Sequence, residues 1–118
     1  MNAQTTIATQ EFIQQEIARG RQYFVLFLKP GPNKNLDSAA VANDQMKHLE
    51  HLFSLKLRGK LPVFGPVLDN PDLEGICIFD AADKEEVKRL IEGDTHVKSG
   101  ALSYEIYTWF SIPGYKLP

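Results

Sequence analysis

The chain has 118 residues, which suits one domain with its own hydrophobic core. Hydrophobic residues make up 43% of it, which excludes a disordered chain, and a net charge of −2 without a run of Lys or Arg argues against a nucleic-acid-binding protein. The single cysteine, Cys77, excludes an internal disulfide and a cysteine-rich metal site.

The first predicted elements are a short helix and a buried strand. Thr9 is a suitable N-cap for the helix, and Gly20 is a typical stop signal after it. The apolar residues of this helix are Phe12, Ile13 and Ile17. Residues 23–28 are a continuous run of aromatic and aliphatic side chains, so we expect a strand that is buried on both faces in the middle of a sheet.

The longest predicted helix runs from about residue 37 or 38 to Arg58. Its main apolar stripe follows the i, i+3, i+7, i+11 pattern, and we expect this stripe to face the core. The stripe consists of Met46, Leu49, Phe53 and Leu57. His48 lies about 140° away from its centre, on a side that also carries Val41, Leu52 and Leu55. We therefore expect a helix covered on two sides, with His48 facing a cleft or a subunit contact.

The second half of the chain predicts three strands and one helix. In chain order, we expect strands over 61–64 and 75–79, a helix from Asp83 to Gly93, a link over 94–100 and a strand over 102–110. Gly65-Pro66 is expected to end the first of these strands, which pairs with the second as a hairpin. The helix begins with a capping-box pattern. Cys77 lies in an apolar strand and is expected to be a small buried core residue.

The resulting order, β-α-β-β-α-β after the short helix, is the ferredoxin-like pattern. We expect an α+β fold in which both helices cover one face of a four-stranded antiparallel sheet. Apolar strand residues on the other face indicate that this face is covered too, most simply by a second copy, so we expect a homodimer through the sheet faces. Residues 1–21 would form an N-terminal extension, and residues 22–118 the domain.

Strong cofactor and metal motifs are missing from the sequence. No phosphate loop, dinucleotide fingerprint, nucleophile elbow or metal-spaced cluster occurs, so we expect no cofactor and no metal. His48 and His51 have a spacing that can ligate a metal, but His96 is the only further histidine. No apolar run approaches the ~18 residues of a membrane span, and a signal peptide is not recognisable. We expect a cytoplasmic protein without a membrane partner, although a chain whose export signal had been removed would look the same.

An ordered series of short motifs runs through the domain. The first are His48-Leu49 on the long helix, Gly59-Lys60-Leu61 after it, and Gly65-Pro66. Further segments of the series are 29–33, 75–79, 85–87, 94–100 and 104–109. At this spacing the chain resembles the YCII-related (YciI-like) proteins from about residue 23 to residue 109. Segment 94–100 resembles the Asp-Pro-x-Val-x-x-Gly segment of that family, with Thr95 in place of the proline.

The resemblance implies a dimeric α/β barrel with a His–Asp active site. His48 takes the place of the family histidine, and its partner would be Asp69 or, alternatively, Asp37. Such a pair could move a proton on a small, oxygenated or cyclic organic molecule, as a lyase or isomerase without a cofactor. Leu52 and Gly65-Pro66 would contact the ligand, since the backbone at a glycine allows close approach.

The sequence leaves less specific interpretations open. His48 is also compatible with a polar residue in a helix–helix or subunit contact. Asp69 lies in an Asp-Asn-Pro-Asp stretch and is also compatible with an ordinary turn residue. Because no strong catalytic motif occurs, the alternative function is a non-catalytic small-ligand-binding or accessory dimerisation module.

Overall fold

The structure is a computed structural model that describes residues 6–118, so residues 1–5 of the predicted extension lie outside the described residues. The elements in chain order are α1 (Gln10–Ala18), β1 (Arg21–Pro30), α2 (Ser38–Leu57), β2 (Val63–Pro66), β3 (Gly75–Phe79), α3 (Lys84–Ile91), α4 (Thr95–Ser99) and β4 (Leu102–Ser111). The predicted order is confirmed, with α4 added. Within the described part of the chain, no helix is long and apolar enough to cross a membrane.

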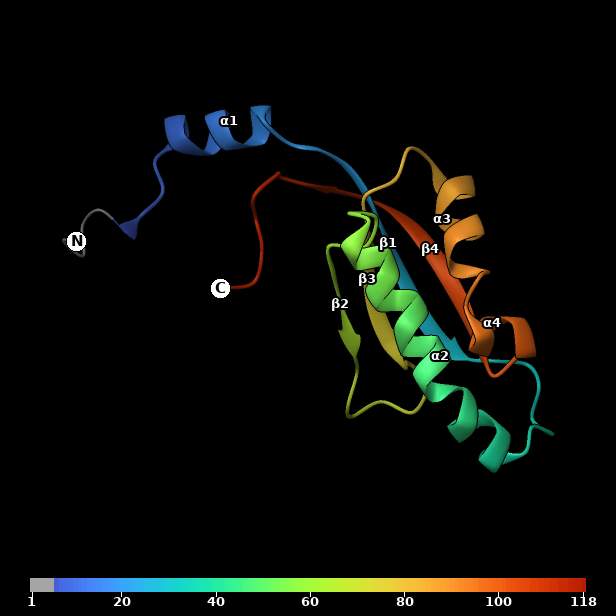
Figure 1. The fold of residues 1–118 in the computed structure, drawn as a ribbon. Helices are drawn as coiled ribbons and strands as arrows, with labels where there is room; N and C mark the ends of the chain where they lie inside the picture. The colour runs from blue at the N-terminus through green and yellow to red at the C-terminus, as the bar shows by residue number, and fades with distance from the viewer. Residues whose placement is uncertain (1–5) are drawn as a thin grey trace.

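The four strands form one sheet in the order β2-β3-β1-β4, and every neighbouring pair is antiparallel. β1 is a central strand, as predicted, and it pairs with β4 from Arg21 opposite Ser111 to Pro30 opposite Leu102. The helices of the domain lie on one side of this sheet (Figure 1). The fold is therefore α+β and ferredoxin-like, the fold of the dimeric α/β barrel proteins.

The hydrophobic core fills the space between the helices and the sheet. Its buried side chains are Phe24, Leu26, Leu28, Leu52, Leu55, Leu61, Cys77, Phe79, Val87 and Ile91. Successive side chains of a strand point to opposite faces, so the alternating burial of β1 assigns Phe24, Leu26 and Leu28 to the core. Val25 and Phe27 consequently lie on the outer face of the sheet.

The predicted orientation of α2 is wrong. Its buried residues are His48, Leu52 and Leu55. Three of the four residues of the stripe expected in the core instead face outward, with Met46, Phe53 and Leu57 exposed by 63%, 54% and 89%, while Leu49 is half-buried. Both sides of this helix carry several large apolar residues, so the hydrophobic pattern alone does not decide between them. The histidine is tolerated inside because its ring finds a hydrogen-bond partner there.

Two local predictions also change. β2 spans Val63–Pro66 instead of 61–64, so Gly65-Pro66 forms the last two residues of the strand instead of following it. Since β2 is an edge strand, the missing N–H of Pro66 is tolerated there. The link expected over 94–100 contains α4, which ends at Gly100 with a φ of 83°, a conformation that favours glycine.

α1 extends away from the sheet at the end where β1 begins (Figure 1). Thr9 caps it as predicted, and its Oγ1 accepts a backbone N–H of the first turn at 3.1 Å. None of the helix residues is buried. Tyr115 Oη donates to Glu16 Oε1 at 3.0 Å, and Arg19 Nη1 donates to the carbonyl of Pro113 at 3.4 Å. The division into residues 1–21 and 22–118 stays a prediction.

Candidate active site

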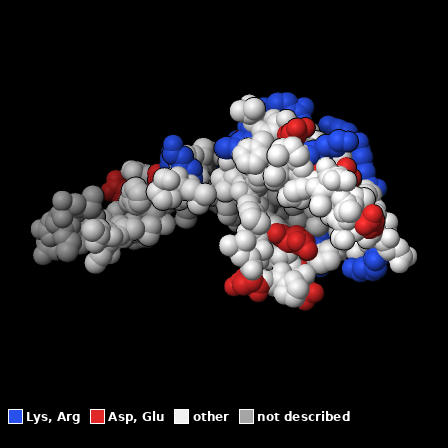
Figure 2. Space-filling model, turned by 60° about the horizontal axis from the view of Figure 1, so that its bottom comes forward, with Lys and Arg blue, Asp and Glu red and all other residues white. Residues whose placement is uncertain are grey.

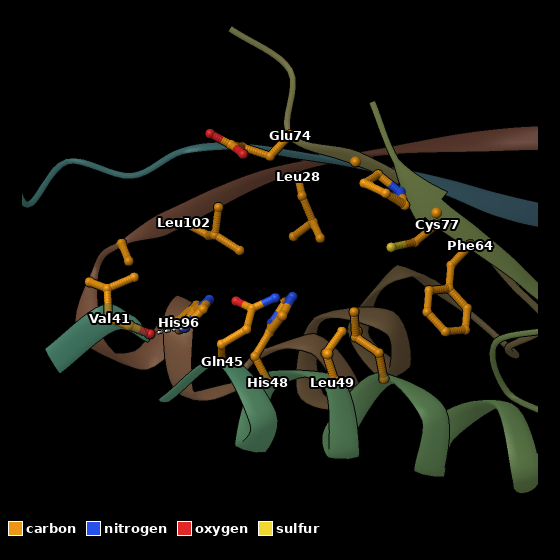
Figure 3. A pocket seen from close by; sticks show the side chains of 15 residues that line it. Leu28, Val41, Gln45, His48, Leu49, Phe64, Glu74, Cys77, His96 and Leu102 are labelled. Atoms are coloured by element: carbon orange, nitrogen blue, oxygen red, sulfur yellow. Dashed lines mark hydrogen bonds between the residues drawn. The ribbon is translucent and has the colours of Figure 1, made fainter. Parts of the chain in front are cut away.

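A cavity of about 370 Å³ lies between α2 and the helix-covered face of the sheet. Figure 3 shows His48 and Gln45 projecting from α2 toward the sheet, and Leu28 and Cys77 on the opposite side of the cavity. Most of the lining is apolar, and these apolar residues are Leu28, Val41, Leu49, Leu52, Phe64, Pro66, Ala101 and Leu102. The cavity therefore presents a few polar side chains within an otherwise apolar enclosure.

His48 is hydrogen-bonded to a fully buried carboxylate. Its Nδ1 lies 2.7 Å from Oδ1 of Asp94, a residue that is 0% exposed. When the Asp94 carboxylate is ionised it can only accept, and Nδ1 of His48 is then the donor of this hydrogen bond. In the neutral ring this leaves the lone pair on Nε2. Because His48 lines the cavity, Nε2 is the atom that can accept a proton from a bound molecule.

Asp94 reaches this position through the turn between α3 and α4. Its backbone N–H donates to the carbonyl of Ile91 at 3.0 Å, which ties the residue to the end of α3. Asp94 is the N-cap residue of α4, yet its side chain makes no cap hydrogen bond. The carboxylate is turned to His48 on the neighbouring α2, so the turn backbone fixes one partner and the long helix fixes the other.

The partner of His48 is Asp94, which corrects the expected pairing with Asp69 or Asp37. Asp69 is exposed in the connection between β2 and β3. Asp37 caps α2, and its Oδ1 accepts the N–H of Ala39 at 3.0 Å. The sequence signal for Asp94 is the family-like motif over 94–100, although the local pattern there predicts only a link. Its position depends on the contact between α2 and α4, which no local pattern predicts.

A second histidine stacks on His48. The ring of His96 lies 4.5 Å from that of His48 between centroids, at an interplanar angle of 11°. His96 is only 5% exposed, and its Nε2 donates to the carbonyl of Val41 at 3.2 Å. The stack and the Asp94 hydrogen bond together fix the plane of the His48 ring. From the sequence, His96 is only a possible metal ligand, and no local pattern signals its stacking on His48.

The residues predicted to contact a ligand reach the same cavity. Leu52, Gly65 and Pro66 line it together with His48. At Gly65 the backbone is open, because an added Cβ would meet no other atom within 4 Å. The structure thus brings four of the six predicted site residues together and leaves the two aspartates outside. Ligand contact by these residues stays a prediction.

Cys77 faces the cavity without being a reactive thiol. The residue is 1% exposed, and burial raises the pKa of its thiol to about 12. Only the thiolate is a strong nucleophile, so this side chain is unreactive near neutral pH. The prediction of a small buried core residue is confirmed.

His51 is directed to a different element. Its Nε2 donates to the carbonyl of Leu90 on α3 at 2.6 Å. His48 and His51 therefore have separate partners, although they are close in sequence. Among the residues that the structure describes, no group of three or more His, Cys, Asp or Glu is arranged to hold a metal ion.

The fold and the site together define a ferredoxin-like α+β protein with a buried His–Asp pair beside a small cavity. The YCII-related domain family matches residues 23–110, and the chain belongs to this family. No curated protein matches the chain.

Among solved structures, the chain is similar to 5-chloro-2-hydroxyhydroquinone dehydrochlorinase (TftG) from Burkholderia phenoliruptrix, in complex with 2,5-dihydroxybenzoquinone. The similarity covers 74% of this chain and 92% of that chain, with 24% sequence identity and a TM-score of 0.57. At this level of identity, the likeness shows a shared fold.

Proposed function

We propose that this protein is a cofactor-independent lyase or isomerase of a small organic molecule, with His48 as its general base. The observation that carries the proposal is the 2.7 Å hydrogen bond from Nδ1 of His48 to the buried carboxylate of Asp94, beside a cavity. Asp94 takes the role that the sequence suggested for Asp69 or Asp37. The proposal needs neither a metal nor a cofactor for the proton transfer.

The pair supports removal of a proton from a bound substrate. Nε2 of His48 takes the proton, and the electron pair left on the substrate forms a new double bond. In a lyase reaction the leaving group departs as an anion with its bonding electrons. In an isomerase reaction Nε2 returns the proton to another atom of the same molecule. The Asp94 carboxylate stabilises the imidazolium formed in either case.

The cavity favours a small ring that carries oxygen substituents. Its volume of about 370 Å³ is near the lower end of the roughly 300–1,000 Å³ of small-molecule sites. Leu28, Phe64 and Leu102 can contact an apolar ring, and the amide of Gln45 lies beside His48 for a polar substituent (Figure 3). TftG is named as a dehydrochlorinase and holds a hydroxylated quinone, which supports this class of substrate here.

The probes for a direct test are 5-chloro-2-hydroxyhydroquinone, assayed by chloride release, and 2,5-dihydroxybenzoquinone, assayed by its effect on the His48 ring signals in NMR. We expect chloride release to fall about 10²–10⁴-fold in His48→Gln, because general-base catalysis contributes this much. His51→Gln is the matched control on the same helix, since His51 bonds to α3 instead of Asp94. No chloride release and no response of His48 to the quinone would contradict the proposed substrate class.

A non-catalytic ligand-binding module is the second candidate. The observation that favours it is the enclosure of His48, which is 9% exposed between Asp94 and the stacked His96. Under this alternative, the quinone binds wild-type protein and His48→Asn with similar affinity, and neither protein turns over the chlorinated probe. Calorimetric titration alongside the chloride assay separates the two candidates.

We also propose that the protein is a homodimer through the outer face of its sheet. Ile76, Tyr107 and Trp109 on this face are exposed by 38%, 49% and 42%, beside the half-buried Val25 and Phe27. A contiguous apolar surface of this kind is typical of an interface, and a second copy offers the same surface. Light scattering should report a dimer at micromolar concentration, and a monomer would contradict the proposal.

A further inference from the structure

α1 carries large apolar side chains that its own domain does not cover. Phe12, Ile13 and Ile17 are exposed by 51%, 45% and 55%, and no residue of the helix is buried. Isolated helices of this length are marginal in water, so α1 needs a packing partner to be stable. Figure 2 shows the N-terminal arm, which we define as residues 6–19, extending away from the rest of the molecule.

An open groove lies at the end of the domain from which the arm departs. It has a volume of about 1150 Å³ and runs from the outer side of α2 across the edge strand β2 to the outer face of the sheet. Its apolar lining is Tyr23, Leu49, Phe53, Pro62, Val63, Phe64, Pro66, Ile78, Trp109, Ile112, Tyr115 and Leu117. Phe53 belongs to the apolar stripe of α2 that the sequence predicts for the core and the structure leaves exposed. A partner bound in the groove would therefore cover this exposed side of α2.

The arm and the groove are complementary in size. α1 has nine residues, so it is about 13 Å long and about 10 Å wide. Such a helix occupies roughly 1,000 Å³, which is close to the volume of the groove. The groove can therefore hold a helix of this length.

The arm and the groove are also complementary in charge. Among the residues that the structure describes, the charged residues that line the groove are Lys56 and Lys116, and none is acidic. Residues 6–19 contain Glu11, Glu16 and Arg19, and Glu16 is paired with Arg19 at 3.1 Å within the arm. Glu11 is therefore the acidic residue that the arm can bring to the two lysines of the groove.

The arm does not fill the groove of its own chain, although Glu16 accepts a hydrogen bond from Tyr115, one of the residues that line it. No residue of α1 lines that groove. Only Arg19 and Gly20 separate α1 from β1, and the hydrogen bonds of Glu16 to Tyr115 and of Arg19 to Pro113 hold the helix in its outward direction. A second copy can supply an arm without breaking these contacts.

We propose that α1 of one copy packs into this groove of a second copy, with its apolar side on Phe53 and Phe64. The inference rests on the proposed homodimer, because Ile78 and Trp109 belong both to the groove and to the outer face of the sheet. Arm docking is therefore continuous with pairing of the sheets. Two reciprocal arms satisfy a closed two-fold dimer.

A disulfide test locates the arm. Ile13→Cys is combined with Phe53→Cys in a Cys77→Ala background, and the protein is mildly oxidised. We expect a covalent dimer on a non-reducing gel. The control pair is Gln15→Cys with Phe53→Cys, because Gln15 lies about 160° around the helix from Ile13 and should cross-link far less. Equal cross-linking of both pairs, a disulfide within one chain, or free thiols in a dimeric protein would overturn the docking of the arm.

Deletion of residues 1–18 separates this inference from the dimer itself. Analytical ultracentrifugation of the full chain and of the deleted chain compares their dimer dissociation constants. We expect a dimer in both cases. The dissociation constant should be at least about tenfold higher after deletion, because three large apolar side chains lose their burial. An unchanged constant would overturn the docking of the arm and leave the dimer standing. A monomeric full chain would overturn both.

Discussion

The orientation of α2 can be tested by two substitutions only two residues apart. Leu55 is 0% exposed and belongs to the core, whereas Leu57 is 89% exposed on the outer side of the helix. Leu→Ala at a buried position removes both transfer free energy and packing, and it costs about 2–5 kcal/mol of unfolding free energy. The same change at an exposed position stays within about 0.5 kcal/mol. We therefore expect Leu55→Ala to be destabilised by at least about 1.5 kcal/mol relative to Leu57→Ala.

Chemical denaturation followed by circular dichroism measures this difference. The two variants remove the same side-chain atoms from the last turn of the same helix. The stripe that contains Leu57 is the one favoured by hydrophobic periodicity alone. A larger loss of stability for Leu57→Ala than for Leu55→Ala would show that this stripe faces the core and would refute the placement of His48 beside the cavity. The comparison is made at low protein concentration, where association of copies contributes least.

Three further predictions follow from single residues. Asp94→Asn should lower the proposed lyase activity, measured as chloride release from 5-chloro-2-hydroxyhydroquinone, because an amide cannot stabilise the imidazolium of His48; unchanged activity would contradict the role of the carboxylate. Burial raises the pKa of Cys77 from 9.0 to about 12, so stability should be intact below pH 9 and fall as the pH rises toward 12, by at most about 1.4 kcal/mol per pH unit. Cys77→Ala should lack this loss of stability at alkaline pH. An unfolding free energy that decreases equally with pH in Cys77→Ala and in the wild-type protein would contradict this prediction. Gly31→Ala should lose more than about 1 kcal/mol of unfolding free energy, because an added Cβ would overlap the backbone carbonyl of Gly100. A thermal unfolding temperature equal to that of the wild-type protein would contradict this prediction.

Much of the fold was predictable because its elements carry strong local signals. The apolar run of β1 predicts a central strand, and the sheet order places it there. Asp83 predicts the start of α3, and its Oδ1 accepts the N–H of Glu86 at 2.8 Å. These patterns work because a cap or a buried strand depends on residues that are adjacent in the chain.

Local sequence patterns did not predict which side of α2 faces the core, nor which aspartate is the partner of His48. The helix has two partly apolar sides. Which of them packs on the sheet depends on how the side chains fit together and on the hydrogen bond that the buried His48 ring makes. Asp94 is 46 residues from His48 in sequence, and it reaches the ring only because α4 packs against α2. Asp69 follows Gly65-Pro66 closely in the sequence, yet the β2–β3 connection carries it to the surface. Distance along the chain was thus a poor guide to distance in the site.

We expect Asp94 to hold the Nδ1 proton of His48 and to leave Nε2 free to accept one. Nitrogen-15 NMR of the histidine rings tests it directly, with the His48 signals assigned by their loss in His48→Gln. In wild-type protein at a pH where the ring is neutral, we expect the proton on Nδ1 and an unprotonated Nε2. This preference should weaken in Asp94→Asn. A wild-type ring with its proton on Nε2, or identical spectra of the ring in the two proteins, would contradict the account.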